Sequence, residues 1–204
     1  MKKSYIVIAV FLSLIFVIFI QIKKPKINSI VLGQSIDKIK TDWSIKELIG
    51  QYPDFEYIFL MPVYKGSKYG ISADEIESII KTAPKFSGKT IMLDKKVLYN
   101  VLLVYPELGI SVVFMHGKVS SIHAQKAATY YYDFFMARYT IKNTYSGSYK
   151  GKIKIGTSKE VVEELLGPLF NKDGWYNYKY GGIEFNYDYT GLVSEIIVKG
   201  GSSD

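Results

Sequence analysis

Residues 156–198 read GTSKEVVEELLGPLFNKDGWYNYKYGGIEFNYDYTGLVSEIIV, and this stretch decides the fold that we predict for the chain. It opens with a helix signal, because Ser158 can cap the free amides of a first turn and Glu160 follows where the helix dipole favours a negative charge. Gly167-Pro168 ends the helix, since proline cannot continue it. Four apolar residues recur at helical spacing and predict one buried stripe: Val161, Val162, Leu165 and Leu166.

Beyond the helix the pattern changes to a period of two, which is typical of strands. Gly181-Gly182 is a two-residue hairpin signal between a tyrosine-rich strand and a return strand over residues 183–187. Gly191 turns the chain again before a third strand over residues 192–198. A tight turn gives three cross-strand pairs of large side chains on one face: Tyr180 with Ile183, Tyr178 with Phe185 and Tyr176 with Tyr187.

A fainter copy of this arrangement occupies residues 70–123. The segment GISADEI, which begins at Gly70, matches the GTSKEVV that begins at Gly156 as G-x-S-x-[DE]-x-[IV], and its Ser72 and Glu75 make a capping box. A strand is predicted over Leu98–Tyr105, and two glycine-led strands follow it in the same order as downstream. We therefore predict a tandem repeat that starts at residue 70 and again at residue 156.

The motifs of residues 156–198 resemble one superfamily. A G-x-[ST]-x-[DE]-x-V helix, a Gly-Pro stop, a W-x-Y strand and the strands G-I-x-F and G-x-V-x-x-I are similar to the SmpA/BamE-like fold, whose tandem form is the beta-lactamase inhibitory protein. The resemblance implies small extracytoplasmic α+β modules that bind other proteins and have no catalytic site. Outer-membrane members carry a lipidated cysteine, whereas this chain has no cysteine, and we transfer no site residues from the family.

The amino-terminal segment predicts a membrane anchor. Residues 5–22 are almost entirely apolar, and a helix of that length spans about 27 Å, close to the hydrocarbon core of a bilayer. A cleaved signal peptide is the alternative, but no A-x-A-like site follows the apolar run. We expect a single-pass transmembrane signal anchor that contacts the lipid bilayer through residues 5–22 and leaves the carboxy-terminal domain extracytoplasmic.

The charge distribution argues against a nucleic-acid partner. The net charge is +7, but residues 1–26 hold five lysines and no acidic residue, so the rest of the chain carries only +2. A nucleic-acid-binding domain has a concentrated basic surface, which this balance does not predict.

The complete prediction is an α+β chain with an N-terminal transmembrane helix followed by two tandem modules, each a helix plus a three-stranded antiparallel sheet. The domains are a membrane anchor at 1–26, a helical lead-in with the first repeat at 27–146 and the second repeat at 147–204. Within the lead-in, Ile45, Leu48 and Ile49 suggest a helix that Gly50 ends. Residues 124–145 fit either a helix or a strand.

We identify no catalytic, cofactor-binding or metal-binding residues. Ser72 and Ser158 are explained as caps, and His116 and His123 lack the context of a metal motif, so we interpret them as a turn histidine and a strand-edge histidine. If the tyrosine face packs inward, Trp175 and Tyr189 are the residues we expect to bind a partner. The predicted function is non-catalytic protein binding at the cell envelope. The alternatives are a secreted or tethered inhibitor of an envelope enzyme and an unrecognised wall-active enzyme.

Overall fold

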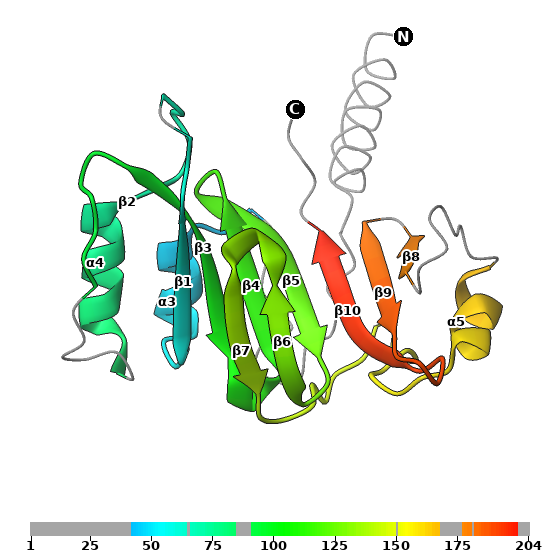
Figure 1. Cartoon of the computed structure of the whole chain (residues 1–204). Coiled ribbons are helices and arrows are strands. Elements are labelled where there is room, and N and C mark those ends of the chain that lie inside the picture. Colours follow the sequence, from blue (N-terminus) through cyan, green and yellow to red (C-terminus); the bar gives the residue numbers. More distant parts are fainter. Residues whose placement is uncertain are drawn as a thin grey trace, which may run out of the picture.

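The computed structural model describes residues 42–64, 66–84, 91–149, 151–167, 177–180 and 182–199. Eight strands in this part of the chain form one antiparallel sheet in the order β1-β3-β4-β5-β10-β9-β8, with the short β2 also paired to β3 (Figure 1). The strands of this sheet are β1 (Tyr57–Pro62), β2 (Ile71–Ser72), β3 (Leu98–Tyr105), β4 (Ile110–Met115), β5 (Lys118–Gln125), β8 (Asn177–Tyr180), β9 (Ile183–Tyr187) and β10 (Val193–Lys199).

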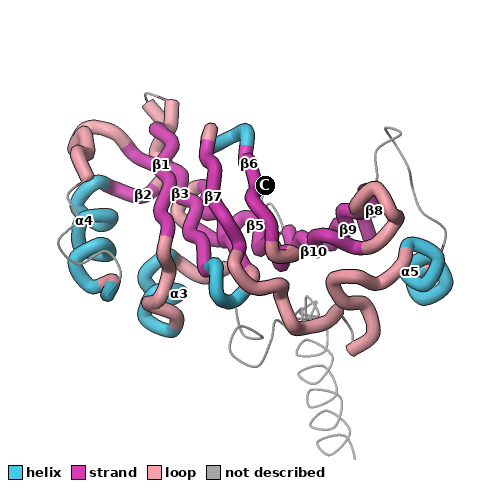
Figure 2. Tube along the Cα trace, turned by 60° about the horizontal axis from the view of Figure 1, so that its bottom comes forward, coloured by secondary structure: helices cyan, strands magenta, loops and turns pink. Residues whose placement is uncertain are grey.

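The two faces of the sheet are covered differently. Helices α3 (Ile45–Gln51) and α4 (Ala73–Thr82) pack on one face, and a separate hairpin of β6 (Ala128–Tyr132) and β7 (Ala137–Ile141) lies on the opposite face (Figure 2). Helix α5 (Lys159–Leu166) lies at the far end, near β8 and β9. The main core therefore fills the helix side, and a smaller core fills the space under the hairpin.

Capping residues start the helices where the sequence indicates. In α3 the Glu47 amide donates to Ser44 Oγ at 3.3 Å and the Ser44 amide donates back to the Glu47 carboxylate at 2.7 Å, which completes a capping box. The Glu75 amide donates to Ser72 Oγ at 3.2 Å at the start of α4. Ser158 stands at the N-cap of α5, but its side chain accepts no bond from the helix amides.

The predicted stripe of α5 is only partly right. Val162 is fully buried, and Leu166 is half-buried against the main core. Val161 and Leu165 are 42% and 38% exposed, so half of the expected apolar stripe faces away from the sheet.

Several strand predictions are confirmed. β3 has the predicted bounds, and the register of β8 with β9 pairs Tyr180 with Ile183 and Tyr178 with Phe185. Tyr176, in the third predicted pair, lies outside the described residues. Within residues 124–145, β6 and β7 form a hairpin over residues 128–141, so the strand alternative holds and the helix alternative is wrong.

The predicted fold class is wrong. The described chain is mainly β, with ten strands and three α-helices, and the strands expected in two three-stranded sheets belong to one sheet. The reason is that β10 pairs with β5, in a register that sets Ile197 opposite His123. Separate three-stranded sheets would leave the edges of β5 and β10 unpaired, and joining them satisfies those backbone groups. The domain boundaries at residues 26 and 146 stay a prediction.

The transmembrane and signal-anchor assignment is also corrected. Within the described ranges, no helix is both long enough and apolar enough to cross a membrane. Residues 5–22, on which that assignment was based, lie outside those ranges. The structure therefore gives the anchor no support.

Candidate functional site

Of the two residues predicted to bind a partner, the structure describes only Tyr189. Tyr189 is 93% exposed in the turn between β9 and β10, where the Asp188 carboxylate accepts bonds from the Thr190 amide at 3.0 Å and from the Thr190 hydroxyl. Trp175 lies outside the described residues. Their joint role in binding stays a prediction.

A more extended candidate is the free edge of the sheet at β1. This strand ends the sheet, and none of the described strands pairs with its outer side. The Val63 amide donates to the Leu98 carbonyl at 2.8 Å, and backbone direction alternates along a strand, so Tyr57, Phe59 and Met61 point their amides toward β3. Ile58 and Leu60 consequently point their amides and carbonyls outward. The backbone nitrogen of Pro62 also points outward. The proline therefore removes no hydrogen bond between β1 and β3.

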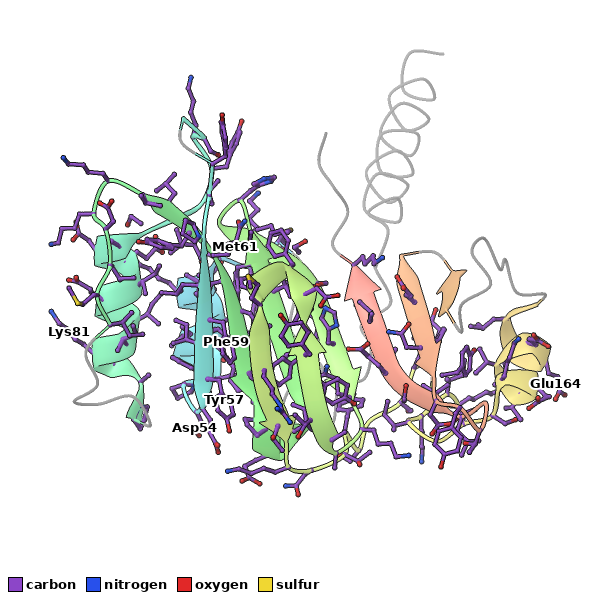
Figure 3. All side chains as sticks on the ribbon, in the orientation of Figure 1. Asp54, Tyr57, Phe59, Met61, Lys81 and Glu164 are labelled. Carbon is purple, nitrogen blue, oxygen red and sulfur yellow. The ribbon has the colours of Figure 1, made fainter. Side chains whose placement is uncertain are left out.

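The side chains of β1 are apolar on both faces and mostly half-buried. On the hairpin face Tyr57 stacks on Phe59, with ring centroids 6.2 Å apart, and Met61 continues this row along the strand (Figure 3). On the helix face Ile58 and Leu60 pack against the main core. Residues 57–62 contain no charged side chain, which is unusual because proteins commonly protect an edge with charges.

The tip of the hairpin adds apolar surface beside this edge. The short 3-10 helix η3 (Asp133–Phe135), which joins β6 to β7, contacts β1. Phe134 is 39% exposed and Met136 is 81% exposed. The edge and the hairpin tip together present backbone donors, backbone acceptors and apolar side chains.

A buried polar network is the second candidate, and it lies on the hairpin face of β5 and β10. His123 Nδ1 lies 2.9 Å from Glu195 Oε1, and His123 Nε2 lies 2.9 Å from Ser121 Oγ. Three further polar groups extend the network: Gln125 donates to Glu195 at 2.9 Å, Asn186 donates to Glu195 at 2.6 Å, and Gln125 donates to Tyr139 of the hairpin at 3.1 Å.

The electrostatics of the network favour a charged Glu195. Burial alone would raise the pKa of Glu195, but the hydrogen bond and charge of His123, with the bonds from Asn186 and Gln125, hold this pKa below its usual value. Burial raises the pKa of Tyr139 to about 12, against the lowering effect of its bonds with Ser111 and Gln125. The network therefore holds one carboxylate between the sheet and the hairpin.

The serine, histidine and glutamate of this network are connected as in a nucleophilic triad. The surroundings do not complete such a site. Ser121 is 8% exposed, and it stands in the middle of the sheet, opposite Val113 on one side and Lys199 on the other. Acyl transfer also requires donors aimed at a developing oxyanion, whereas the ladders of β5 occupy the backbone amides around Ser121. We interpret the network as an anchor for the hairpin.

The network predicts a loss of stability in acid. Because the folded pKa of Glu195 is lowered, its contribution is fully present above its usual value of 4.5 and is lost as the pH falls below it. We expect Glu195→Gln to lower the free energy of unfolding by about 2 kcal/mol at pH 7. That difference should shrink as the pH falls below 4.5 in chemical denaturation. A difference that is the same at every pH would contradict the assignment.

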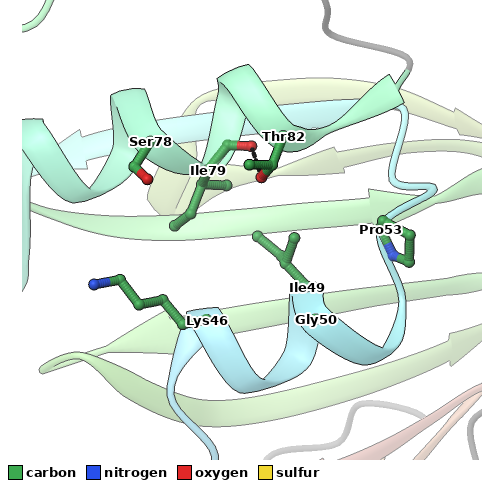
Figure 4. Close-up of a pocket in the computed structure, with 7 residues that line it drawn as sticks. All are labelled: Lys46, Ile49, Gly50, Pro53, Ser78, Ile79 and Thr82. Atoms are coloured by element: carbon green, nitrogen blue, oxygen red, sulfur yellow. Dashed lines mark hydrogen bonds between the residues drawn. The ribbon is translucent and has the colours of Figure 1, made fainter.

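The helix side carries a pocket between α3 and α4 with a volume of about 340 Å³ (Figure 4). Ile49, Ile79 and Pro53 supply its apolar lining, and Lys46 stands at one end. The Thr82 hydroxyl donates to the Ile79 carbonyl at 2.9 Å, so it is already engaged within the helix. The pocket offers few groups that could bind a polar ligand. Its one charged side chain is Lys46, whose Nζ also lies 3.9 Å from the Glu75 carboxylate.

Sequence reasoning missed both candidates. The lead-in was treated as helical, with no strand predicted in it, yet Tyr57–Pro62 is a strand. Its uninterrupted apolar run ending in proline was the available signal. His123 was interpreted as a strand-edge histidine, but pairing with β10 places it inside the sheet. In the described ranges no group of three or more histidine, cysteine, aspartate or glutamate side chains could hold a metal ion.

Comparison with known proteins adds no relative: no protein-family model, no curated protein and no solved structure matches the chain. The resemblance to the SmpA/BamE-like fold therefore stays a prediction, and the functional argument rests on the geometry of the chain itself.

Proposed function

We propose that this chain is a non-catalytic protein-binding module whose partner adds an extended strand to the edge of β1. The observation that carries the proposal is the combination, in one strand, of outward backbone groups at Ile58 and Leu60 with an uncharged, half-exposed row of side chains. Strand addition uses such an edge, since main-chain hydrogen bonds give affinity and alternate side chains give specificity. A partner at the cell envelope stays a prediction from the sequence.

The expected partner segment is extended and apolar on the face that meets the hairpin side. There it would continue the row of Tyr57, Phe59 and Met61, and it would reach the exposed Met136 at the hairpin tip. A charged residue of the segment on the face that meets the hairpin would be buried without a counter-charge, which would weaken binding. The edge is therefore expected to select peptides whose apolar residues occupy alternate positions.

Met61→Lys is expected to weaken this binding by about tenfold or more, because the new charge lies on the strand at the junction with the added segment. Eight-residue peptides with alternating apolar residues, selected by display on the full chain, would be measured by fluorescence anisotropy. Met92→Lys is the matched control, since Met92 is 97% exposed and belongs neither to β1 nor to the hairpin tip, and this variant should bind as the unmodified chain does.

Amide exchange then locates the bound peptide. Binding should protect the Ile58 and Leu60 amides and change the amides of Phe59 and Met61 little, because the latter already bond to β3. Peptides that bind Met61→Lys at full strength, or that protect β8 instead of β1, would refute the proposal.

A further inference from the structure

We infer that the occupant that fits this edge best is a second copy of the same chain, with the two β1 strands antiparallel about a two-fold axis at Phe59. The inference rests on the proposed function, since it names a partner for the same edge. Its basis is that β1 is complementary to itself in backbone, side chains and terminal charge.

The backbone complementarity follows from which residues point outward. Pairing Ile58 of one copy with Leu60 of the other, and the reverse, uses all four outward amides and the four carbonyls of the same residues. Pairing Leu60 with Leu60 would set Ile58 opposite Pro62, which has no amide to donate to it. The register with Ile58 opposite Leu60 therefore satisfies the most groups and leaves Pro62 outside the ladder.

The same register brings apolar side chains together. Phe59 faces Phe59 across the axis in a non-hydrogen-bonded pair, where side chains approach most closely. Tyr57 of each copy faces Met61 of the other, so the row on the hairpin face continues unbroken from one copy into the next. No like charges meet within residues 57–62, because none of these residues is charged.

The ends of β1 carry opposite charges. Asp54 precedes the strand, and Lys68 follows it. Antiparallel pairing sets Asp54 of one copy opposite Tyr64 of the other, at the end of the strand that Lys68 follows. A parallel arrangement would instead bring the two acidic ends together. The two-fold register joins both eight-stranded sheets into one and leaves neither β1 as an edge.

Cysteine crosslinking tests the register directly, because the full chain has no cysteine of its own. Phe59→Cys places two thiols across the axis at a Cα separation of about 4.5 Å, which a disulfide can bridge. Tyr57→Cys and Met61→Cys should crosslink only when the two variants are mixed. Ile58→Cys should not crosslink, because the two copies of residue 58 lie more than about 7 Å apart. Met92→Cys serves as the exposed control.

Rapid crosslinking of Phe59→Cys and of the mixed pair would support the dimer. The unmodified chain should also sediment with a mass above that of its 23.2 kDa monomer, and Met61→Lys should sediment as the monomer. A monomer whose Phe59→Cys crosslinks no faster than Met92→Cys would overturn the dimer. In that case, peptide binding still lost in Met61→Lys would keep the proposed function and give the edge to another protein. A monomer whose Ile58 and Leu60 amides are protected without peptide would place a segment of the same chain there, and would overturn the inference too.

Discussion

Gly109→Ala is expected to lower the free energy of unfolding by about 3 kcal/mol or more, and the thermal midpoint by about 6–12 °C. Gly109 has a φ of 70° in the turn between η2 (Pro106–Leu108) and β4. A methyl group there would stand 2.4 Å from the Tyr145 amide nitrogen and 2.7 Å from the Asn143 carbonyl oxygen. Both are backbone atoms, so no side-chain rotation relieves the contact.

The neighbouring backbone is held in place from several sides. The Gly109 carbonyl accepts from the Gln125 amide at 2.8 Å, and the Tyr145 amide donates to the Gln125 carbonyl at 2.9 Å. The Pro106 carbonyl accepts from the Asn143 amide at 3.1 Å. Moving the chain at residues 143–145 would therefore break bonds that join β5 to the segment after the hairpin.

Gly151→Ala separates the two causes of this loss. Gly151 also has a positive φ, of 72°, but a methyl group there meets nothing within 4 Å. We expect it to cost only the backbone strain, about 1 kcal/mol. Equal losses for the two variants, measured by urea denaturation, would show that the close approach at Gly109 is not the cause.

Glu195→Ala is expected to cost about 3–5 kcal/mol, because it leaves buried donors of His123, Gln125 and Asn186 without their acceptor. The hairpin should loosen first, since Gln125 also bonds to Tyr139 of β7. Faster amide exchange in β6 and β7 than in β3 would report this order.

Two comparisons sharpen this expectation. Glu107→Ala removes an exposed carboxylate with its own partner, Lys142, and should cost less than about 1 kcal/mol. His123→Leu combined with Glu195→Leu should cost less than Glu195→Ala alone. As many polar groups lose a partner, but no buried imidazole is left facing an empty acceptor position, and the leucine side chains fill space that alanine leaves open. A double variant that is less stable than the single one would contradict this account of the network.

Local signals predicted the local structure well. Ser72 and Ser158 both stand at the N-cap positions predicted for them, because helix starts depend on residues within one turn, although only Ser72 accepts a bond from a helix amide. The register of β8 with β9 followed from a two-residue turn, which fixes which residues face each other. In each case the interacting groups are a few residues apart in sequence.

What the sequence could not predict depends on distant pairing. His123 and Glu195 are separated by 72 positions, and only the pairing of β5 with β10 brings them together. The same pairing overturned the two-sheet fold class. Val161 and Leu165 follow a helical stripe, yet exposure depends on what the helix packs against, which periodicity does not specify.

The position of β10 determines the order in which the sheet can form during synthesis. During synthesis β10 leaves the ribosome after every other described strand, yet it belongs in the interior of the sheet, between β5 and β9. Until it arrives, β5 ends a nascent sheet whose edge is open, and His123 and Gln125 of β5 lack the Glu195 acceptor. Such non-local closure is slow, since the intervening loop must be ordered first. Ribosome stalling or truncation ahead of Val193 would therefore release a chain in which β1 and β5 are both unpaired sheet edges. Chaperones recognise intermediates of this kind.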